Sequence, residues 1–309
     1  MRIIEEYRAS KIIYNFLKSQ KIIKPFLLPA NVCEVIPLTF YMAGVDFEFV
    51  DITKDDYLID KDFVLQNINQ YAGLLFVRTY GVEDDYNFFF SKLKEINENF
   101  IIIDDSCLST PNFEIDKSIF DLKIYSLGYA KPIDLGVGAF GFVNSKLSYN
   151  NFETVYNEKI YDEYSSQVKG CILNKTQIKK RDYNFLDNTT YKIDKEYVLN
   201  RIRLVLKHKQ ELNEIYSNML PNEIQLDKKF QNWRFNILVE PSVKDKIMKE
   251  LFANNLFASN HYYPISNIWS DKTCKNAVDL YDKVINLFND FYYTKEQAIK
   301  TSEVINRFL

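Results

Sequence analysis

The sequence predicts an α/β protein with a mostly parallel β-sheet, and two observations support this class. Strand-length apolar runs alternate with stretches of helical periodicity three or more times before Lys131. One of these runs, Phe100–Ile103, stops at two carboxylates, Asp104 and Asp105, which is typical of a buried strand in a parallel sheet. Ligands bind at the carboxyl ends of strands in open α/β sheets, so residues that follow strands are the first candidates for a site.

The elements of the sheet and its covering helices are bounded by Pro, Gly and charged residues. We expect strands at Pro25–Leu28, Phe47–Val50, Gly73–Arg78, Leu122–Tyr125 and Ala139–Val143. We expect helices at Tyr7–Leu17, Phe63–Ile68 and Tyr86–Ile96, and a further helix that runs to Ala43 with Gly44 as its C-cap.

The pattern changes in the second half of the chain, which predicts a second, smaller domain. Asn150–Gly170 has helical character, Asn174–Lys195 is polar and irregular, and Glu196–Met219 is a long helix that links the domains. We expect the large domain over residues 1–205 and a small α+β domain over residues 206–309. The elements predicted within the small domain are a strand at Trp233–Val239, a helix at Val243–Phe252 and a strand or turn at Ala258–Pro264.

Composition argues against several classes of function. The net charge is −3 over 309 residues, without a basic block that would attract nucleic acid. No apolar stretch is long enough to cross a bilayer, and the first residues lack the apolar core of a signal peptide, so we expect a cytoplasmic protein. The four cysteines have no paired spacing and the two histidines lie far apart, so we expect reduced thiols and no metal site.

An acid, a hydroxyl and a lysine follow neighbouring strands. Asp105 ends one strand, Ser126 ends the next, and Lys131 lies five residues further on, before the turn Gly136–Gly138. This combination suits pyridoxal phosphate (PLP), because a lysine amine binds the aldehyde covalently and a carboxylate keeps the pyridine nitrogen protonated. A hydroxyl and free backbone N–H groups would hold the phosphate.

Three segments in this region resemble the nucleotide-sugar aminotransferase family of the DegT/StrS type. The family has an (E/D)-D-A-x-(H/Q) pattern after one strand, S-F-x-x-x-K after the next, and then a G-E-G-G-like turn. The corresponding segments here are DDSCL, SLGYAK and GVGA. The resemblance implies a PLP-dependent transferase (aspartate aminotransferase-like) fold, with a mainly parallel seven-stranded sheet in the large domain and a small C-terminal α+β domain.

The resemblance also implies roles for individual residues. Lys131 would bind PLP covalently and move a proton, Asp105 would pair with the pyridinium, and Ser126 would bind the phosphate. The other implied cofactor-binding residues are Arg8 and Ala9 at the phosphate, Cys33 on the ring face, Tyr80 beneath the cofactor, Leu108 where the family has His or Gln, and Asn184, which would reach the neighbouring subunit's phosphate. Two residues, His261 and Tyr129, are expected at the substrate.

Further properties implied by the resemblance are the substrates and the assembly. The acceptor would be a nucleotide-linked keto sugar, the amino donor glutamate, the product an amino sugar for surface polysaccharide or glycan biosynthesis, and the protein a homodimer. Two other interpretations stay open. One is a PLP enzyme with a different reaction, such as decarboxylation or cleavage of an amino acid. The other is a non-catalytic relative that binds a sugar nucleotide or a protein partner.

Each of these residues also has an ordinary structural explanation. An Asp pair at a strand end is often solvated or caps a helix, and Asn184 in a polar loop is typical of a turn. A lone histidine such as His261 is more often a satisfied interface residue than a catalytic one. Cys33 by itself is typical of a small buried apolar residue. The ordered set of Asp105, Ser126 and Lys131 therefore carries the functional prediction.

Overall fold

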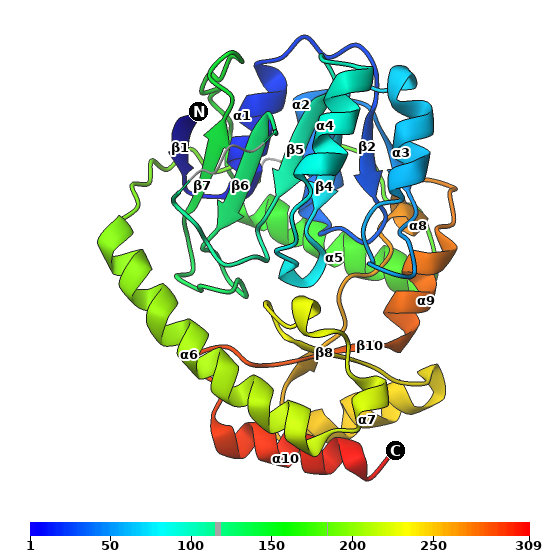
Figure 1. Cartoon of the computed structure of the whole chain (residues 1–309). Helices are drawn as coiled ribbons and strands as arrows, with labels where there is room; N and C mark the ends of the chain where they lie inside the picture. Colours follow the sequence, from blue (N-terminus) through cyan, green and yellow to red (C-terminus); the bar gives the residue numbers. More distant parts are fainter. Residues whose placement is uncertain (115–118, 184) are drawn as a thin grey trace.

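The computed structural model describes residues 1–114, 119–183 and 185–309. Its large domain contains a seven-stranded sheet with the strand order β1-β7-β6-β5-β4-β2-β3 (Figure 1). The strands are β1 (Arg2–Glu6), β2 (Phe26–Pro29), β3 (Phe47–Val50), β4 (Gly73–Val77), β5 (Ile101–Asp105), β6 (Leu122–Ser126) and β7 (Ala139–Val143). β7 runs antiparallel to both of its neighbours, β1 and β6, while the other pairs are parallel. The mainly parallel sheet expected from the sequence is therefore confirmed.

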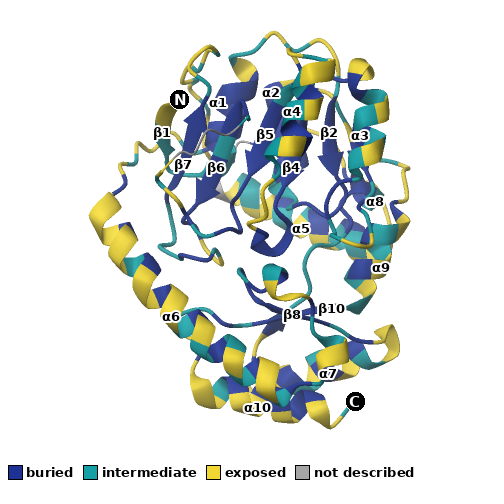
Figure 2. Cartoon of the chain, in the orientation of Figure 1, coloured by how far each residue is buried: buried dark blue, intermediate teal, exposed yellow. Residues whose placement is uncertain are grey.

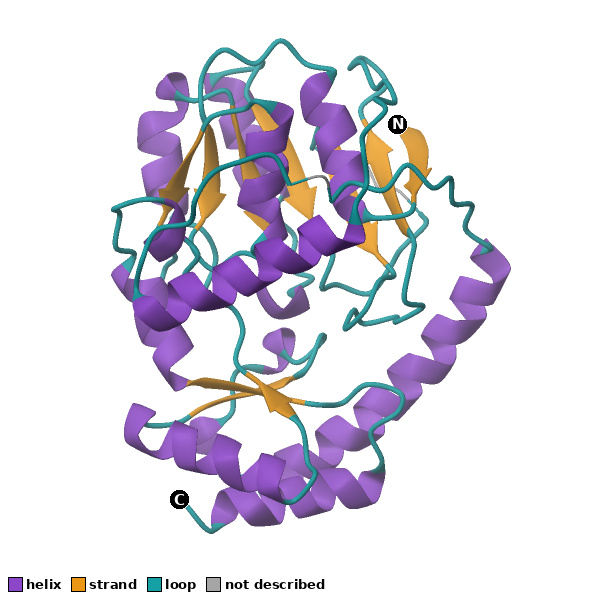
Figure 3. Ribbon diagram, turned by 180° about the vertical axis from the view of Figure 1, so that it is seen from behind, coloured by secondary structure: helices purple, strands orange, loops and turns teal. Residues whose placement is uncertain are grey.

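Helices cover both faces of this sheet. α1 (Ala9–Lys18), α2 (Val35–Ala43) and α5 (Glu158–Asn174) lie on one face, and α3 (Lys61–Asn67) and α4 (Asn87–Ile96) lie on the other (Figures 1 and 3). The central strands are consequently buried, as Figure 2 shows, and all five residues of β4 are apolar or glycine. This explains why these strands read as continuous apolar runs rather than as alternating patterns.

Local signals set the ends of several helices. α2 ends at Gly44, which adopts the left-handed conformation with φ of 71°, as the sequence predicted. α3 begins after Asp60, whose carboxylate accepts a hydrogen bond from the Phe63 amide at 3.0 Å. In the described part of the chain, Arg8 at the start of α1 makes no such side-chain cap. The first N–H groups of α1 are therefore left for another acceptor.

The small domain lies below the large sheet in Figure 1 and is built on a three-stranded antiparallel sheet with the order β8-β10-β9. Its elements are α6 (Lys195–Met219), β8 (Phe235–Leu238), α7 (Pro241–Ala253), β9 (Ala258–Ser259), β10 (Val284–Leu287) and α10 (Lys295–Asn306). Between β9 and β10 lie α8 (Ser266–Trp269) and α9 (Lys275–Lys283). Short 3₁₀ helices span Ile68–Gln70, Thr79–Gly81, Asn222–Ile224 and Lys228–Phe230.

The buried apolar residues form two clusters. One fills the large domain, and the other joins α6, α7 and α10 to the small sheet, with Leu212, Ile237 and Ile305 among its members. Ile268 of α8 and Ala277 of α9 belong to the first cluster. The C-terminal part of the chain thus packs against both cores, which ties the small domain to the large one.

Several elements differ from the sequence-based expectation. The structure adds β1, which pairs with β7, and β10, the centre of the small sheet. β5 continues through Asp104 and Asp105, where the sequence pattern predicted its end. The carboxylates could join the strand because each finds partners on its own side of the sheet. Among the helices within the described residues, none has the length and apolarity to cross a membrane.

A lysine is buried where α6 meets the domain junction. Lys209 is 4% exposed, and its Nζ donates to the Trp233 carbonyl and to Asn289 Oδ1, both at 2.7 Å. Burial lowers the pKa of Lys209 to about 7, against a smaller opposing effect of Asp290. Since the pKa in the folded chain lies below that of the unfolded chain, the unfolded chain binds more protons between about pH 7 and the usual lysine pKa.

We therefore expect the contribution of Lys209 to the stability of the fold to increase as the pH rises from about 7 towards 10. The free energy of unfolding of wild type, minus that of Lys209→Met, should increase by roughly 1.4 kcal/mol for each pH unit in this interval. Chemical denaturation of both proteins at several pH values measures the difference. Lys207→Met, at an exposed position on the same helix, is the control and should parallel wild type. Parallel curves for Lys209→Met would show that the buried lysine stays charged.

Candidate functional site

A cavity of about 450 Å³ lies at the carboxyl ends of β5 and β6, next to the beginning of α1. Asp105 comes from the end of β5, Ser126 from the end of β6, and Lys131 from the loop that follows β6. Arg8 and Ala9 at the start of α1 line the same cavity. The topology places these residues together because β5 and β6 are parallel neighbours, so their carboxyl ends lie at the same edge.

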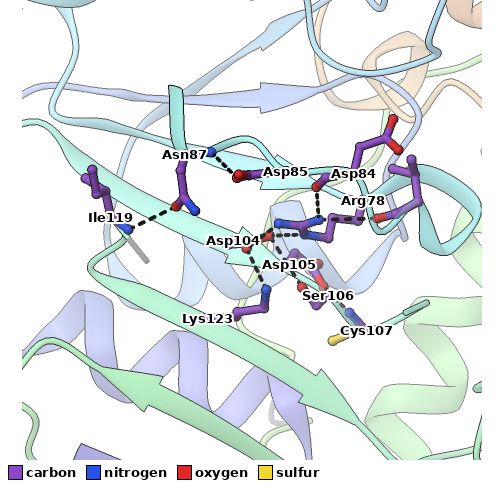
Figure 4. A network of polar contacts seen from close by, with 11 residues as sticks. Arg78, Asp84, Asp85, Asn87, Asp104, Asp105, Ser106, Cys107, Ile119 and Lys123 are labelled. Carbon is purple, nitrogen blue, oxygen red and sulfur yellow. Dashed lines mark hydrogen bonds and ion pairs between the residues drawn. The ribbon is translucent and has the colours of Figure 1, made fainter. Parts of the chain in front are cut away.

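The two adjacent carboxylates of β5 face opposite sides of the sheet, because side chains alternate along a strand. Asp105 lines the cavity that contains Lys131. Asp104 is 1% exposed and lies on the other side, where Arg78 binds it through Nε at 2.8 Å and Nη2 at 3.0 Å. Lys123 Nζ approaches the same carboxylate at 3.1 Å, and Figure 4 shows both cations around it. The alternation of side chains along β5 thus decides that Asp105, and not Asp104, faces the cavity.

The environments of these carboxylates push their pKa values in opposite directions. For Asp104, burial would raise the pKa, but Lys123 and Arg78 together hold it below its usual value. For Asp105, burial prevails and raises the pKa, although the hydrogen bonds to Cys107 and the charge of Lys131 act in the lowering direction. Asp105 Oδ1 accepts the Cys107 amide at 3.0 Å. A cation placed against Asp105 would stabilise its ionised form.

The cavity also presents donors suited to an anion. Here the uncapped start of α1 offers free N–H groups, and the helix dipole favours negative charge at this end. Ser126 is buried and its Oγ accepts the Gly128 amide at 3.3 Å. A Cβ added at Gly128 would meet Arg8 Nη1 and Ser126 Oγ, each at 3.5 Å. The missing side chain of Gly128 therefore leaves open the space between a guanidinium and a hydroxyl.

The loop that carries Lys131 is held by several hydrogen bonds. Asp134 accepts the amides of Ala130 and Gly136 through its two oxygens, each at 2.9 Å. Arg8 Nη1 donates to the Gly136 carbonyl at 3.1 Å, which connects this loop to the start of α1. The lysine itself is half-buried and lines the cavity. One cavity is thus lined by an amine, a carboxylate and donors suited to an anion.

No family model matches this sequence, and no curated protein matches it. Solved structures match nearly the whole chain. Spr1654 of Streptococcus pneumoniae, assigned as a sugar aminotransferase and solved in its PLP-form, is 15% identical, with a TM-score of 0.72, over 99% of this chain and 88% of its own. A DegT DnrJ EryC1 StrS aminotransferase of Brucella abortus is 16% identical, with a TM-score of 0.69, over 100% and 86%. DesI, solved in the presence of its TDP-sugar product, is 11% identical, with a TM-score of 0.71, over 99% and 80%.

The chain has the fold of PLP-dependent sugar aminotransferases. The resemblance seen in the sequence is therefore confirmed at the level of the fold, together with the seven-stranded sheet and the small C-terminal α+β domain that it implied. Each of these three structures is at most 16% identical to this chain. The roles of individual residues therefore rest on the geometry of this chain.

The structure gathers most of the sequence-predicted site residues around the one cavity. The lining residues among them are Lys131, Asp105, Ser126, Arg8, Ala9, Cys33, Leu108 and Tyr129. Cys33 is half-buried, and burial raises the pKa of its thiol to about 12, so this residue offers a neutral apolar surface. Leu108 is buried and gives the cavity an apolar wall where the family has a hydrogen-bonding side chain.

Two predicted residues are not among the described residues that line this cavity, and a third is not described. Tyr80 is fully buried and is not among the described residues that line the cavity; its ring stacks on Trp233 and its hydroxyl donates to the His261 carbonyl at 2.8 Å. His261 does not line the cavity either; its ring is edge-on to that of Trp233, and burial, Arg234 and Lys131 lower its pKa to about 4. Asn184 lies outside the described residues. Its proposed reach into a second subunit stays a prediction.

Other lining residues were not singled out from the sequence. Cys107 and Tyr262 line the cavity, and Tyr161 joins them from α5. Tyr262 directly follows His261, so the structure places the neighbour of the predicted substrate residue in the cavity. In a short irregular segment the sequence has no periodicity that could show which of two adjacent residues faces the cavity. Cys107 could have been found from its position two residues after Asp105, where a turn returns the chain to the same face.

Proposed function

We propose that this protein is a PLP-dependent aminotransferase that acts on a nucleotide-linked keto sugar. The observation that carries the proposal is one cavity lined by the three kinds of group that PLP requires. These are the buried carboxylate of Asp105, the amine of Lys131, and the anion site formed by Ser126, Gly128 and the start of α1. The fold shared with sugar aminotransferases supports the same proposal.

The residues present fit this cofactor. Asp105 would face the pyridine nitrogen, and its buried carboxylate would be ionised by the positive charge of that ring. The α1 amides, Ser126 Oγ and the Arg8 guanidinium would hold the phosphate. Cys33 would cover one face of the ring with a polarisable sulfur. When bound, PLP supplies an electrophilic carbon for covalent attachment and an electron sink.

Lys131 has two tasks in the proposal. Its Nζ would anchor the cofactor before the amino donor arrives. Once the donor has displaced it, the free amine would remove the proton from the carbon that bears the amino group. Lys131 is half-buried and lines the cavity, so its Nζ can reach a substrate carbon that is bound there. Asp105 would support this step from the far side of the ring by keeping the ring nitrogen protonated.

The substrates and the assembly are further parts of this proposal. DesI was solved with a TDP-sugar product, which supports a nucleotide-linked acceptor, and we propose glutamate as the donor. We further propose that the product serves surface polysaccharide or glycan biosynthesis and that the protein is a cytoplasmic homodimer. The free state of all four cysteines is compatible with a reducing compartment. Tyr129, 72% exposed beside the cavity, is the residue that we expect a second subunit or a substrate to cover.

The test is an absorbance spectrum of the purified protein with added PLP, before and after borohydride, followed by peptide mass mapping. We expect a visible absorbance band that borohydride removes, and a reduced PLP adduct on the peptide that contains Lys131. An adduct without amino transfer from glutamate to keto sugars would favour a different PLP reaction. The absence of both band and adduct would contradict the proposal and favour a non-catalytic relative that binds a sugar nucleotide or a protein partner.

A methyl group at Gly128 should separate phosphate binding from folding. The Cβ of Gly128→Ala meets its neighbours at ordinary contact distances, 3.5 Å or more, so the fold should be unaffected. The same methyl group occupies the space between Arg8 and Ser126, so we expect the Kd for PLP to rise by about tenfold or more. Titration with PLP and with pyridoxal, which lacks the phosphate, measures the effect. An equal loss for both compounds would contradict the assignment of the anion site.

A further inference from the structure

The residue that precedes the lysine is held in a strained conformation. Ala130 has a φ of 57°, in the left-handed region that non-glycine residues seldom adopt. Such a conformation persists only where the surroundings determine it. The direction in which the chain enters Lys131 depends on this one residue. Whatever holds Ala130 therefore also sets where the lysine side chain starts.

Side chains hold both backbone polar groups of Ala130. Its amide donates to Asp134 Oδ2 at 2.9 Å, within the same loop. Its carbonyl accepts a hydrogen bond at 2.6 Å from Nε1 of Trp233, which lies two residues before β8 of the small domain. The loop thus supplies one contact, and a segment 103 positions along the chain supplies the other.

Trp233 is itself held in place by aromatic contacts and by backbone hydrogen bonds. Its ring is nearly parallel to two tyrosine rings, that of Tyr80 with centroids 6.4 Å apart and planes at 3°, and that of Tyr262 with centroids 6.1 Å apart and planes at 12°. Its backbone amide donates to the Tyr80 carbonyl at 3.2 Å, and its carbonyl accepts from the buried Lys209 at 2.7 Å. The side chain is 4% exposed. A donor fixed this firmly has little rotational freedom to lose when it binds Ala130.

We propose that Trp233 is a positioning residue for Lys131, acting through the Ala130 carbonyl. It links the small domain to the position of the amine, so the reach of the lysine into the cavity depends on the contact between the two domains. This proposal rests on the proposed function for the role of Lys131, but the hydrogen bond and the strained residue belong to the chain alone. In this proposal the rings of Tyr80 and Tyr262 hold the indole so that its N–H donates to the Ala130 carbonyl.

The test uses Trp233→Phe, which keeps an aromatic ring in the stack and removes the N–H donor. In the protein without added PLP, hydrogen exchange of peptides covering residues 128–136 should become about 3- to 10-fold faster, as expected for one lost hydrogen bond. The rate at which added PLP becomes fixed to Lys131 by borohydride should fall by a similar factor. Trp269→Phe is the matched control, because Trp269 packs against Tyr41 and Phe47 at the other end of the sheet. It should leave both rates unchanged.

A second variant guards against misfolding of Trp233→Phe. Asp134→Ala releases the amide of Ala130 from within the loop and leaves the aromatic stack intact, so it should loosen the same peptides and slow the same reaction. If Trp233→Phe matches the Trp269→Phe control in exchange and in PLP attachment, or if the loop loosens in either variant without slower attachment, the positioning role is wrong. If wild type attaches no PLP to Lys131, the proposed function fails, while the exchange rates still test whether Trp233 holds the loop.

Discussion

Lys131→Ala should abolish covalent attachment of PLP and lower the rate of amino transfer by about 10³-fold or more, because the chain loses both the anchoring amine and the base. The fold should survive. Lys131 is half-buried on a loop whose hydrogen bonds are made by Asp134, Arg8 and Trp233 rather than by the lysine side chain. Borohydride reduction with mass mapping measures attachment, and thermal unfolding measures stability.

The matched control for this variant is Lys192→Ala, at an exposed lysine of the neighbouring groove that also contains Tyr129. It should retain the adduct on Lys131. Added methylamine should restore part of the lost amino transfer in Lys131→Ala, since a small free amine can take up the proton in place of the side chain. A borohydride-stable adduct elsewhere in Lys131→Ala, with amino transfer at the wild-type rate, would refute the assignment of this lysine.

The two adjacent carboxylates should respond to substitution in opposite ways. Asp104→Asn removes the charge that pairs with the largely buried Arg78 and Lys123, so we expect a loss of about 3–5 kcal/mol in the free energy of unfolding. The loop after β4 should also be destabilised, because Arg78 Nη1 donates to the Asp84 carbonyl at 2.9 Å. Denaturant titration measures the difference. A shift within 0.5 kcal/mol of wild type, about the size of a surface substitution, would contradict this structural role.

Asp105→Asn should leave stability within about 1 kcal/mol of wild type, because burial already disfavours the charge of this carboxylate in the protein alone. Its effect should appear at the cofactor instead. With a neutral amide facing the ring nitrogen, we expect weaker PLP binding and amino transfer slowed by about 10²-fold or more. If Asp104→Asn, assayed at a temperature where it is folded, loses amino transfer and Asp105→Asn does not, the assignment of the two acids is reversed.

The sequence alone determined the fold class and the core of the candidate site. Apolar runs with β-forming residues predicted six of the strands in the large sheet, because strands covered on both faces have no polar side to interrupt the run. The order of Asp105, Ser126 and Lys131 along the chain was sufficient to place them together. Parallel strands that are neighbours in a sheet bring the residues after them to one edge, whatever the details of packing.

Only the tertiary structure decided which groups surround that core. Periodicity cannot show that Trp233 of the small domain reaches Ala130, or that Tyr262 rather than His261 lines the cavity, because such contacts join segments far apart in sequence. The same holds for β10, which lies at the centre of the small sheet through pairings with β8 and β9. Short local segments of the sequence thus supply the chemical groups of the site. Its positioning depends on hydrogen bonds and stacked rings that exist only when the two domains have packed together.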